Sequence, residues 1–193
     1  MKKAKNRTTI TIAVMSLLAI ALLGFYFYWN YRTKPIEETS LENMTKAQKL
    51  IAKDLELYYP ETPREVVKLF GDMMNALYDN ISDEDMEPLA LKIRELYDED
   101  FLAVNPEETY LTNLKTDLAE WKKNNRRIAT NFIVRKEEEQ QSVMEGVNYS
   151  INYISFTIQE GHKYNETWKV MLRQDSNKKW KILGWQVEPS EQQ

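Results

Sequence analysis

The sequence contains no cysteine, and this absence removes several kinds of chemistry. The chain cannot form disulfides, thiolate zinc sites or a cysteine nucleophile, and it lacks the lipidated cysteine of a lipoprotein. Its single histidine, His162, cannot build a multi-histidine metal site. Because His162 falls in a predicted hairpin turn, we expect a solvated side chain rather than a pH-responsive contact, a metal ligand or a catalytic group. The sequence therefore predicts no metal and no cofactor.

Acidic residues are missing from the first 34 positions, which hold six basic side chains. Since the whole chain has 26 basic and 30 acidic residues, residues 35–193 carry 20 − 30 = −10 charges. A segment this acidic repels phosphate backbones, so we expect no nucleic-acid partner.

Charged residues are also absent between Thr8 and Tyr31. A helix needs about 20 mostly apolar residues to cross the hydrocarbon core, because peptide groups find no water there. Aromatic residues from Phe25 to Tyr31 suit the headgroup layer, and Arg32 and Lys34 follow. The sequence predicts a transmembrane anchor that contacts the lipid bilayer from Thr8 to Tyr31.

Basic residues are more numerous before this segment than just after it, which predicts a cytoplasmic N-terminus. The C-terminal domain would then lie outside the cytoplasm, displayed from the plasma membrane by a single span. A cleaved signal peptide is the alternative. We favour retention because aromatic rings, rather than the small residues that signal peptidase requires, follow the apolar run.

The composition of the chain, 42% hydrophobic and 11% aromatic, suits one globular domain plus the anchor. The predicted segments are a cytoplasmic tail (1–7), the anchor (8–31), a tether (32–39), an extra helix (40–60), an α+β domain (61–189) and a short tail (190–193).

Capping patterns predict where the helices begin. Thr39 or Ser40 with Glu42 opens the extra helix, which ends at Pro60. The sequence Thr62-Pro63-Arg64-Glu65 has the pattern of a capping box with proline in the first turn. Ser82 with Asp85 opens a third helix that 98–100 closes, and 105–108 opens a fourth that ends near residue 124.

After residue 125 the hydrophobic period changes from about 3.6 to 2, which indicates strands. We expect four antiparallel strands with turns at 160–163 and 175–178. The apolar positions change phase near Tyr153 and again at Leu183, so a bulge or bend is expected at each. A short strand at 101–104 is also expected.

This order of elements resembles the nuclear-transport-factor-like (SnoaL-like) superfamily over residues 62–188. The resemblance implies an α+β domain in which a bent, mainly antiparallel four-stranded sheet wraps around helices to form a cone. Three segments are similar to a family of uncharacterised single-pass proteins of Gram-positive gut anaerobes: YPETPREVV (59–67), LYDEDFLAVNP (96–106) and KWKILGW (179–185). Superfamily members include isomerase-like enzymes, small-ligand binders and scaffold domains of secretion machines, so fold alone does not select a function.

Few residues suggest pocket chemistry. Glu166 shares a strand face with Trp168 and would be a base or ligand anchor if that face lined the cone, whereas pairing with a neighbouring Lys or Arg is the structural alternative. Asp117 on the fourth helix presents the same choice. Tyr149, Tyr153 and Trp168 supply ring area for a core, a pocket or a partner surface. The acidic clusters at 82–85 and 98–100 lack the glycine and spacing of a calcium loop and fit helix starts.

These observations favour a non-enzymatic, membrane-tethered interaction or scaffold domain, with envelope proteins or a second copy as partners. A small-ligand-binding or enzymatic cone pocket is the first alternative. A subunit of a secretion or conjugation channel is the second, and it depends on topology alone.

Overall fold

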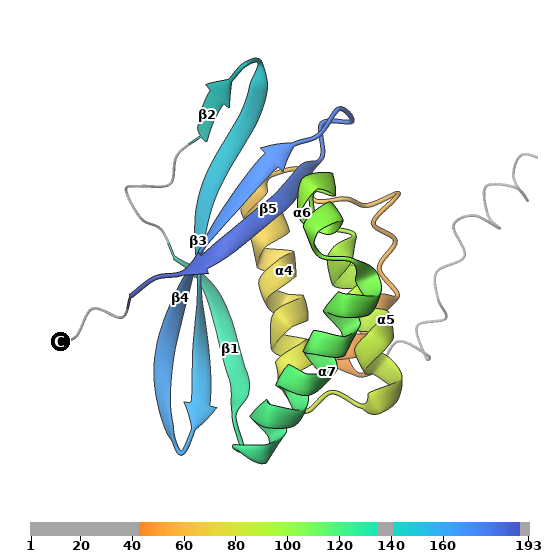
Figure 1. Ribbon diagram of the computed structural model, residues 1–193, viewed down its shortest axis with the longest axis vertical. Helices are drawn as coiled ribbons and strands as arrows, with labels where there is room; N and C mark the ends of the chain where they lie inside the picture. The colour runs from red at the N-terminus through yellow and green to blue at the C-terminus, as the bar shows by residue number, and fades with distance from the viewer. Residues whose placement is uncertain (1–42, 135–140, 190–193) are drawn as a thin grey trace, which may run out of the picture. The chain divides into compact units, whose positions relative to one another are not determined.

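The computed structural model describes residues 43–134 and 141–189, and Met44 onward belongs to one compact unit (Figure 1). This α+β unit packs helices against one face of an antiparallel sheet. Its elements are α3 (Lys46–Ile51), α4 (Pro63–Tyr78), α5 (Asp83–Arg94), α6 (Glu99–Val104), α7 (Glu107–Lys123), β1 (Arg127–Val134), β2 (Gln141–Met144), β3 (Val147–Glu160), β4 (His162–Gln174) and β5 (Trp180–Val187).

The predicted anchor (8–31), tether (32–39) and C-terminal tail (190–193) lie outside the described residues. Within residues 43–134 and 141–189, no helix has the length and apolar character to span a membrane.

Helix α4 begins as its capping box predicts. The Thr62 hydroxyl accepts a hydrogen bond from the Glu65 amide at 3.2 Å, and the Glu65 carboxylate accepts one from the Thr62 amide at 3.1 Å. Pro63 occupies the first turn, where no amide donor is required. The helix then buries one side, including Phe70 and Met73, both fully buried, against the sheet. Helix α4 is therefore the central core helix.

Helix α5 confirms the predicted start at Ser82, whose hydroxyl accepts from the Asp85 amide at 3.2 Å. Its predicted end at 98–100 is wrong, because the helix stops at Arg94 and Tyr97 forms a bridge to Ile182 of β5. This bridge places Asp98 beside the sheet edge.

The extra helix is shorter than predicted. Its described part, α3, begins after Thr45 and ends at Ile51, not at Pro60. The chain leaves the helix because the Asp54 carboxylate accepts the amides of Glu56 and Leu57 and forms a local turn. Tyr58, which falls within the predicted helix, is consequently 72% exposed. The predicted cap at residues 39–42 lies outside the described residues.

The predicted short strand at 101–104 is also wrong, since this segment lies in α6. Asp98 caps the helix by accepting from the Asp100 amide at 3.0 Å. Asn105 does not cap α7 as predicted; its side-chain amide donates to the Phe101 carbonyl at 2.9 Å, at the end of α6. Helix α7 starts without a side-chain cap and ends at Lys123, close to the predicted position.

The sheet has five strands rather than the expected four, in the order β1-β3-β4-β5, with β2 also paired to β3. The second of the expected strands, predicted over 143–158, is interrupted at Glu145 and Gly146, both with positive φ (53° and 80°). Two such residues make the tight turn of a hairpin. The predicted turns at 160–163 and 175–178 are confirmed as the β3–β4 and β4–β5 connections.

No register shift occurs at Tyr153, so of the bulge or bend expected there, the bulge is wrong. Strand β3 pairs with β4 without interruption from Tyr149 to Glu160. The apparent phase change has another cause: in the first half of β3 the helix-facing positions are the polar residues Ser150 and Asn152, which are buried and hydrogen-bonded to each other at 2.9 Å. Apolar residues in this half occupy the opposite face.

The second predicted slip is confirmed in β5. Met171 is opposite Gly184, whereas the next residue of β4, Leu172, is opposite Ile182. Leu183 is thus the extra residue of a β-bulge.

Candidate functional site

The carboxylate of Glu166 lies on the helix-facing side of the sheet. Glu166 and Trp168 are two residues apart in β4 and therefore share one face. The Trp168 indole Nε1 donates to Glu166 Oε1 at 2.7 Å. The other oxygen, Oε2, is 3.8 Å from Arg126 Nη2. The structure thus brings together two predicted residues and gives Glu166 a cationic partner, as the structural alternative expected, although the sequence did not identify that partner as Arg126.

Arg126 lies between the end of α7 and the start of β1. Its guanidinium is 4.1 Å from the centre of the Trp121 ring, and its Nε is 3.6 Å from Glu160 Oε2. Nε is buried and has no hydrogen-bond partner, because its ion pair with Glu160 is longer than a hydrogen bond. Arg126 therefore neutralises two carboxylates and covers an aromatic ring.

Asp117 contacts Tyr78, whose ring packs against that of Trp121. Its Oδ2 accepts the Tyr78 hydroxyl at 2.5 Å. Burial first, and then this hydrogen bond, raise the pKa of Tyr78, so the phenol remains a donor at neutral pH. The Tyr78 ring lies 4.5 Å from Trp121. Through Trp121 and Arg126, Asp117 and Glu166 thus flank one continuous row of side chains.

Aromatic rings fill the space between the sheet and helices α4 and α6. Trp168 and Trp185 stack at 5.6 Å with an interplanar angle of 4°, and Phe70 lies 5.2 Å from Trp185. Phe156 meets Trp168 edge-on at 4.8 Å, and Phe101 meets Trp185 at 5.5 Å. These distances are typical of packed aromatic pairs. The rings near Glu166 form part of the core.

Two further tyrosines border this cluster. Tyr97 is 4% exposed, and burial, followed by its interaction with Tyr110, raises its pKa well above the ordinary value. Burial also raises the pKa of Tyr110, whose ring lies 5.0 Å from the Arg94 guanidinium. Both phenols are therefore neutral at physiological pH and serve as hydrogen-bonding core residues.

Tyr149 and Tyr153 lie on the opposite face of β3 from Glu166. Tyr153 is opposite Lys169 and Tyr149 is opposite Arg173, whereas Glu166 is opposite Phe156 on the helix-facing side. The alternation of side chains along a strand produces this separation. The five predicted site residues therefore do not form one pocket.

The acidic cluster at residues 98–100 has a structural role that the sequence did not reveal. Asp98 is 2% exposed on its side chain and accepts two hydrogen bonds from Arg173, from Nε at 3.0 Å and from Nη2 at 2.5 Å. Arg173 Nη1 also lies 2.8 Å from Asp100 Oδ2. The bidentate contact between Arg173 and Asp98 joins β4 to the start of α6 across the sheet edge.

No group of three or more potential metal-ligating side chains is present in residues 43–134 and 141–189. His162 is exposed at the start of β4, and its ring lies 5.7 Å from that of Tyr164. The structure places this histidine where the turn prediction expected it.

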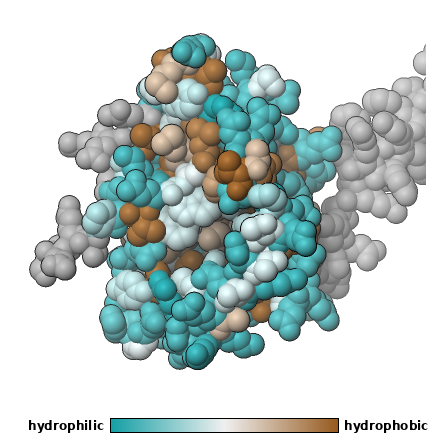
Figure 2. Space-filling model, viewed as in Figure 1, coloured by the Kyte–Doolittle hydropathy of each residue, from teal (hydrophilic) through white to brown (hydrophobic). Residues whose placement is uncertain are grey.

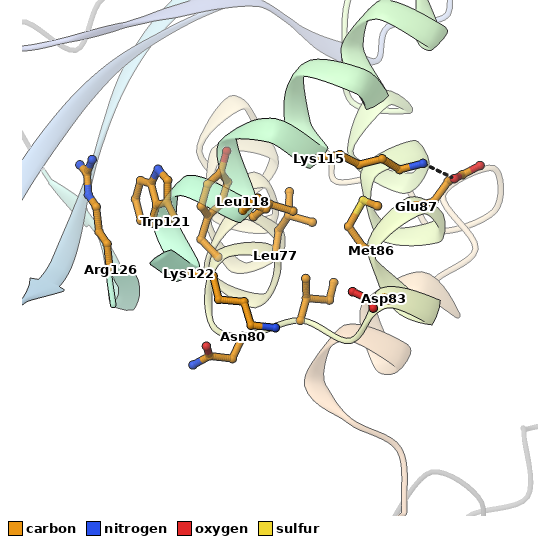
Figure 3. A pocket seen from close by; sticks show the side chains of 13 residues that line it. Leu77, Asn80, Asp83, Met86, Glu87, Lys115, Leu118, Trp121, Lys122 and Arg126 are labelled. Atoms are coloured by element: carbon orange, nitrogen blue, oxygen red, sulfur yellow. Dashed lines mark hydrogen bonds and ion pairs between the residues drawn. The ribbon is translucent and has the colours of Figure 1, made fainter. Parts of the chain in front are cut away.

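A groove of about 580 Å³ opens where the end of α4, the first half of α5 and the second half of α7 meet (Figure 3). Its apolar lining includes Leu77, Ile81, Met86 and Leu118. Figure 3 shows Trp121 and Arg126 at one end and the Lys115–Glu87 pair at the other. No local sequence pattern indicated this groove, because it depends on how three helices converge.

Comparison with protein families gives a match over residues 1–185 to the family described as Domain of unknown function (DUF6715). No curated protein and no solved structure matches the chain. Since the match covers nearly the whole sequence, the chain belongs to this family.

Proposed function

We propose, starting from membership in a family whose description names no activity, that this chain is a membrane-tethered, extracytoplasmic interaction domain without catalytic function. One observation carries the proposal: both candidate acids, Glu166 on β4 and Asp117 on α7, already have partners. Glu166 is bound by Trp168 and faces Arg126, and Asp117 is bound by Tyr78. We interpret acids engaged in this way as structural groups that hold neighbouring elements together.

The anchor predicted between Thr8 and Tyr31 supports the membrane-tethered part of the proposal. The order of helices followed by a long antiparallel meander supports the resemblance to the nuclear-transport-factor-like superfamily. In that superfamily the helix-facing side of the sheet is the site of ligand pockets. Here the same side carries the stacked pair Trp168 and Trp185.

Apolar side chains on other surfaces suit a protein partner. Phe132 of β1 and Met171 of β4 are 47% and 45% exposed, and Val143 and Met144 of the β2–β3 hairpin are 68% and 58% exposed. In Figure 2, hydrophobic side chains lie at the top of the visible face, where Figure 1 places this hairpin. These exposed apolar side chains are the surface groups that such a partner would cover.

Site-specific photocrosslinking of the full-length chain in native membranes tests the proposal. A photoreactive amino acid at Met171 or Val143 should produce a discrete crosslinked species, either with another envelope protein or with a second copy. The matched control is the exposed position Asn113 on α7, which should give monomer only. Monomer at all three positions would contradict an interaction role.

The substitution Glu166→Gln separates this role from a ligand-binding cone. It keeps the shape of the side chain and its hydrogen bond from Trp168 but removes the charge facing Arg126. We expect a folded protein with unchanged crosslinking. A folded variant that lost binding of a small molecule recognised by the wild type in a thermal-shift screen would overturn the interaction-only proposal.

A further inference from the structure

The groove between α4, α5 and α7 is lined by Tyr78 and Trp121 but not by the stacked pair Trp168 and Trp185, and it takes no part in the function proposed above. Its floor is apolar: Leu77 is 1% exposed, and Ile81, Met86 and Leu118 are partly buried around it. Its volume of about 580 Å³ falls in the range of about 300–1,000 Å³ that is typical of small-molecule sites. The lining thus suits the apolar part of a small ligand.

Most of the charged groups that line the groove already have a partner and are not free to bind a ligand. Lys115 Nζ lies 3.4 Å from Glu87 Oε2, so these two charges largely cancel. Asp83 stands in the first turn of α5, where the positive end of the helix stabilises a carboxylate. At the opposite end Arg126 is shared with Glu160 and Glu166.

Lys122 is the cation that remains available. It forms no ion pair with another residue of the described ranges 43–134 and 141–189, although it lines the groove. In Figure 3 its side chain extends from α7 along the side where Asn80 and Asp83 lie, away from the Lys115–Glu87 pair. An ammonium group beside an apolar floor combines two kinds of recognition in one site.

We propose that this groove binds a small amphipathic carboxylate. The apolar part of the ligand lies on Leu77, Met86 and Leu118, and its carboxylate accepts hydrogen bonds from the Lys122 ammonium. A charged hydrogen bond of this kind is stronger than a neutral one. The net charge of −10 on residues 35–193 does not prevent this contact, because salt screens distant charges beyond about 8 Å.

Three probes that share one skeleton test the proposal on the full-length chain in detergent: 4-phenylbutyrate, 4-phenylbutanol and 4-phenylbutylamine. Isothermal titration calorimetry should give saturable one-to-one binding of the carboxylate, at least about tenfold tighter than that of the alcohol or the amine. Absence of saturable carboxylate binding, or equal affinity for the three probes, would overturn the proposal.

Two substitutions locate the site. Lys122→Gln should weaken carboxylate binding about tenfold, because it removes the cation and leaves the apolar floor intact. Lys123→Gln is the matched control: this adjacent, exposed lysine does not line the groove and should leave affinity unchanged. Equal losses in both variants would show general charge attraction and refute a defined site.

A steric variant tests the same groove independently of charge. Ala119 is exposed on α7 and lines the groove, so Ala119→Trp should fill it and abolish binding while Ala119→Ser retains it. Thermal melting followed by circular dichroism identifies folded variants. Wild-type affinity in a folded Ala119→Trp protein would place the ligand elsewhere and overturn the assignment.

Discussion

The close contact between α4 and β3 predicts that the loss of stability caused by one substitution is rescued by a second substitution. Gly71 is buried in α4, and a Cβ atom at this position would lie 2.0 Å from Ile154 Cδ1 and 3.0 Å from Asn131 Nδ2. Ordinary contacts begin at 3.4 Å, so Ile154 would have to retreat by about 3.4 − 2.0 = 1.4 Å. Because Ile154 is itself fully buried, it has little room to move.

The expected energies follow from this clash. Gly71→Ala should gain up to about 1 kcal/mol from helix propensity and lose about 1–3 kcal/mol through overpacking, for a net loss of about 1 kcal/mol. Ile154→Val alone should cost about 1 kcal/mol, because it removes the methyl group that would clash and leaves a small void. The double variant should approach wild-type stability, with a coupling energy of about −2 kcal/mol.

Urea unfolding of the full-length chain in detergent, followed by tryptophan fluorescence, measures these values from the midpoints and slopes. Ile182→Val is the matched control, since it makes the same change in a fully buried residue two strands away. Combined with Gly71→Ala, it should be additive. Additivity of the Gly71 and Ile154 substitutions would refute the packing of α4 on β3 described above.

Three further predictions concern stability. Arg173→Gln should lower the free energy of unfolding, measured with urea, by about 2–3 kcal/mol, because it leaves the buried Asp98 carboxylate without its cation. Asp98→Asn should lower it less, since Arg173 keeps its ion pair with Asp100. Equal losses in the two variants would contradict this asymmetry. Thr62→Ala should lose about 1 kcal/mol with its cap, and no loss would exclude a capping contribution. Hydrogen bonds from the Thr62 amide and hydroxyl hold the pKa of Glu65 below its usual 4.5, so the stabilisation they give is present above that pH and is lost as the pH falls through the folded pKa. The melting temperature of Glu65→Gln should therefore vary less below pH 4.5 than that of the wild type. Identical pH profiles would refute the link between these hydrogen bonds and stability.

Local patterns predicted the helix starts because the groups that make them are close in sequence. Thr62 with Glu65 and Ser82 with Asp85 satisfy exposed amides within one turn, whatever packs around them. The β-bulge at Leu183 was equally visible, since alternation of side chains records which face is buried.

The incorrect predictions arose where tertiary contacts override periodicity. The change in the phase of apolar positions near Tyr153 was misleading, because apolar residues occupy both faces of β3 while Ser150 and Asn152 face the helices. Residues 101–104 form a helix because Asp98, held by Arg173 from β4, caps them. That partner is 75 residues away and cannot be inferred from spacing.

The candidate site shows the same difference between contacts that are local in sequence, which could be predicted, and tertiary contacts, which could not. Glu166 and Trp168 could be grouped from the sequence because they alternate on one strand. Their third partner, Arg126, and the link from Tyr78 to Asp117 require α7 to lie against both α4 and the sheet. The groove that contains Lys122 depends on three helices and left no local pattern.

The intact mass of the mature protein, recovered from native cells after alkaline extraction of membranes, tests the proposed tethered role most directly. We expect a chain that stays in the membrane pellet and keeps the residues from Thr8 to Tyr31. Recovery in the soluble fraction of a chain beginning near Asn30 would contradict it.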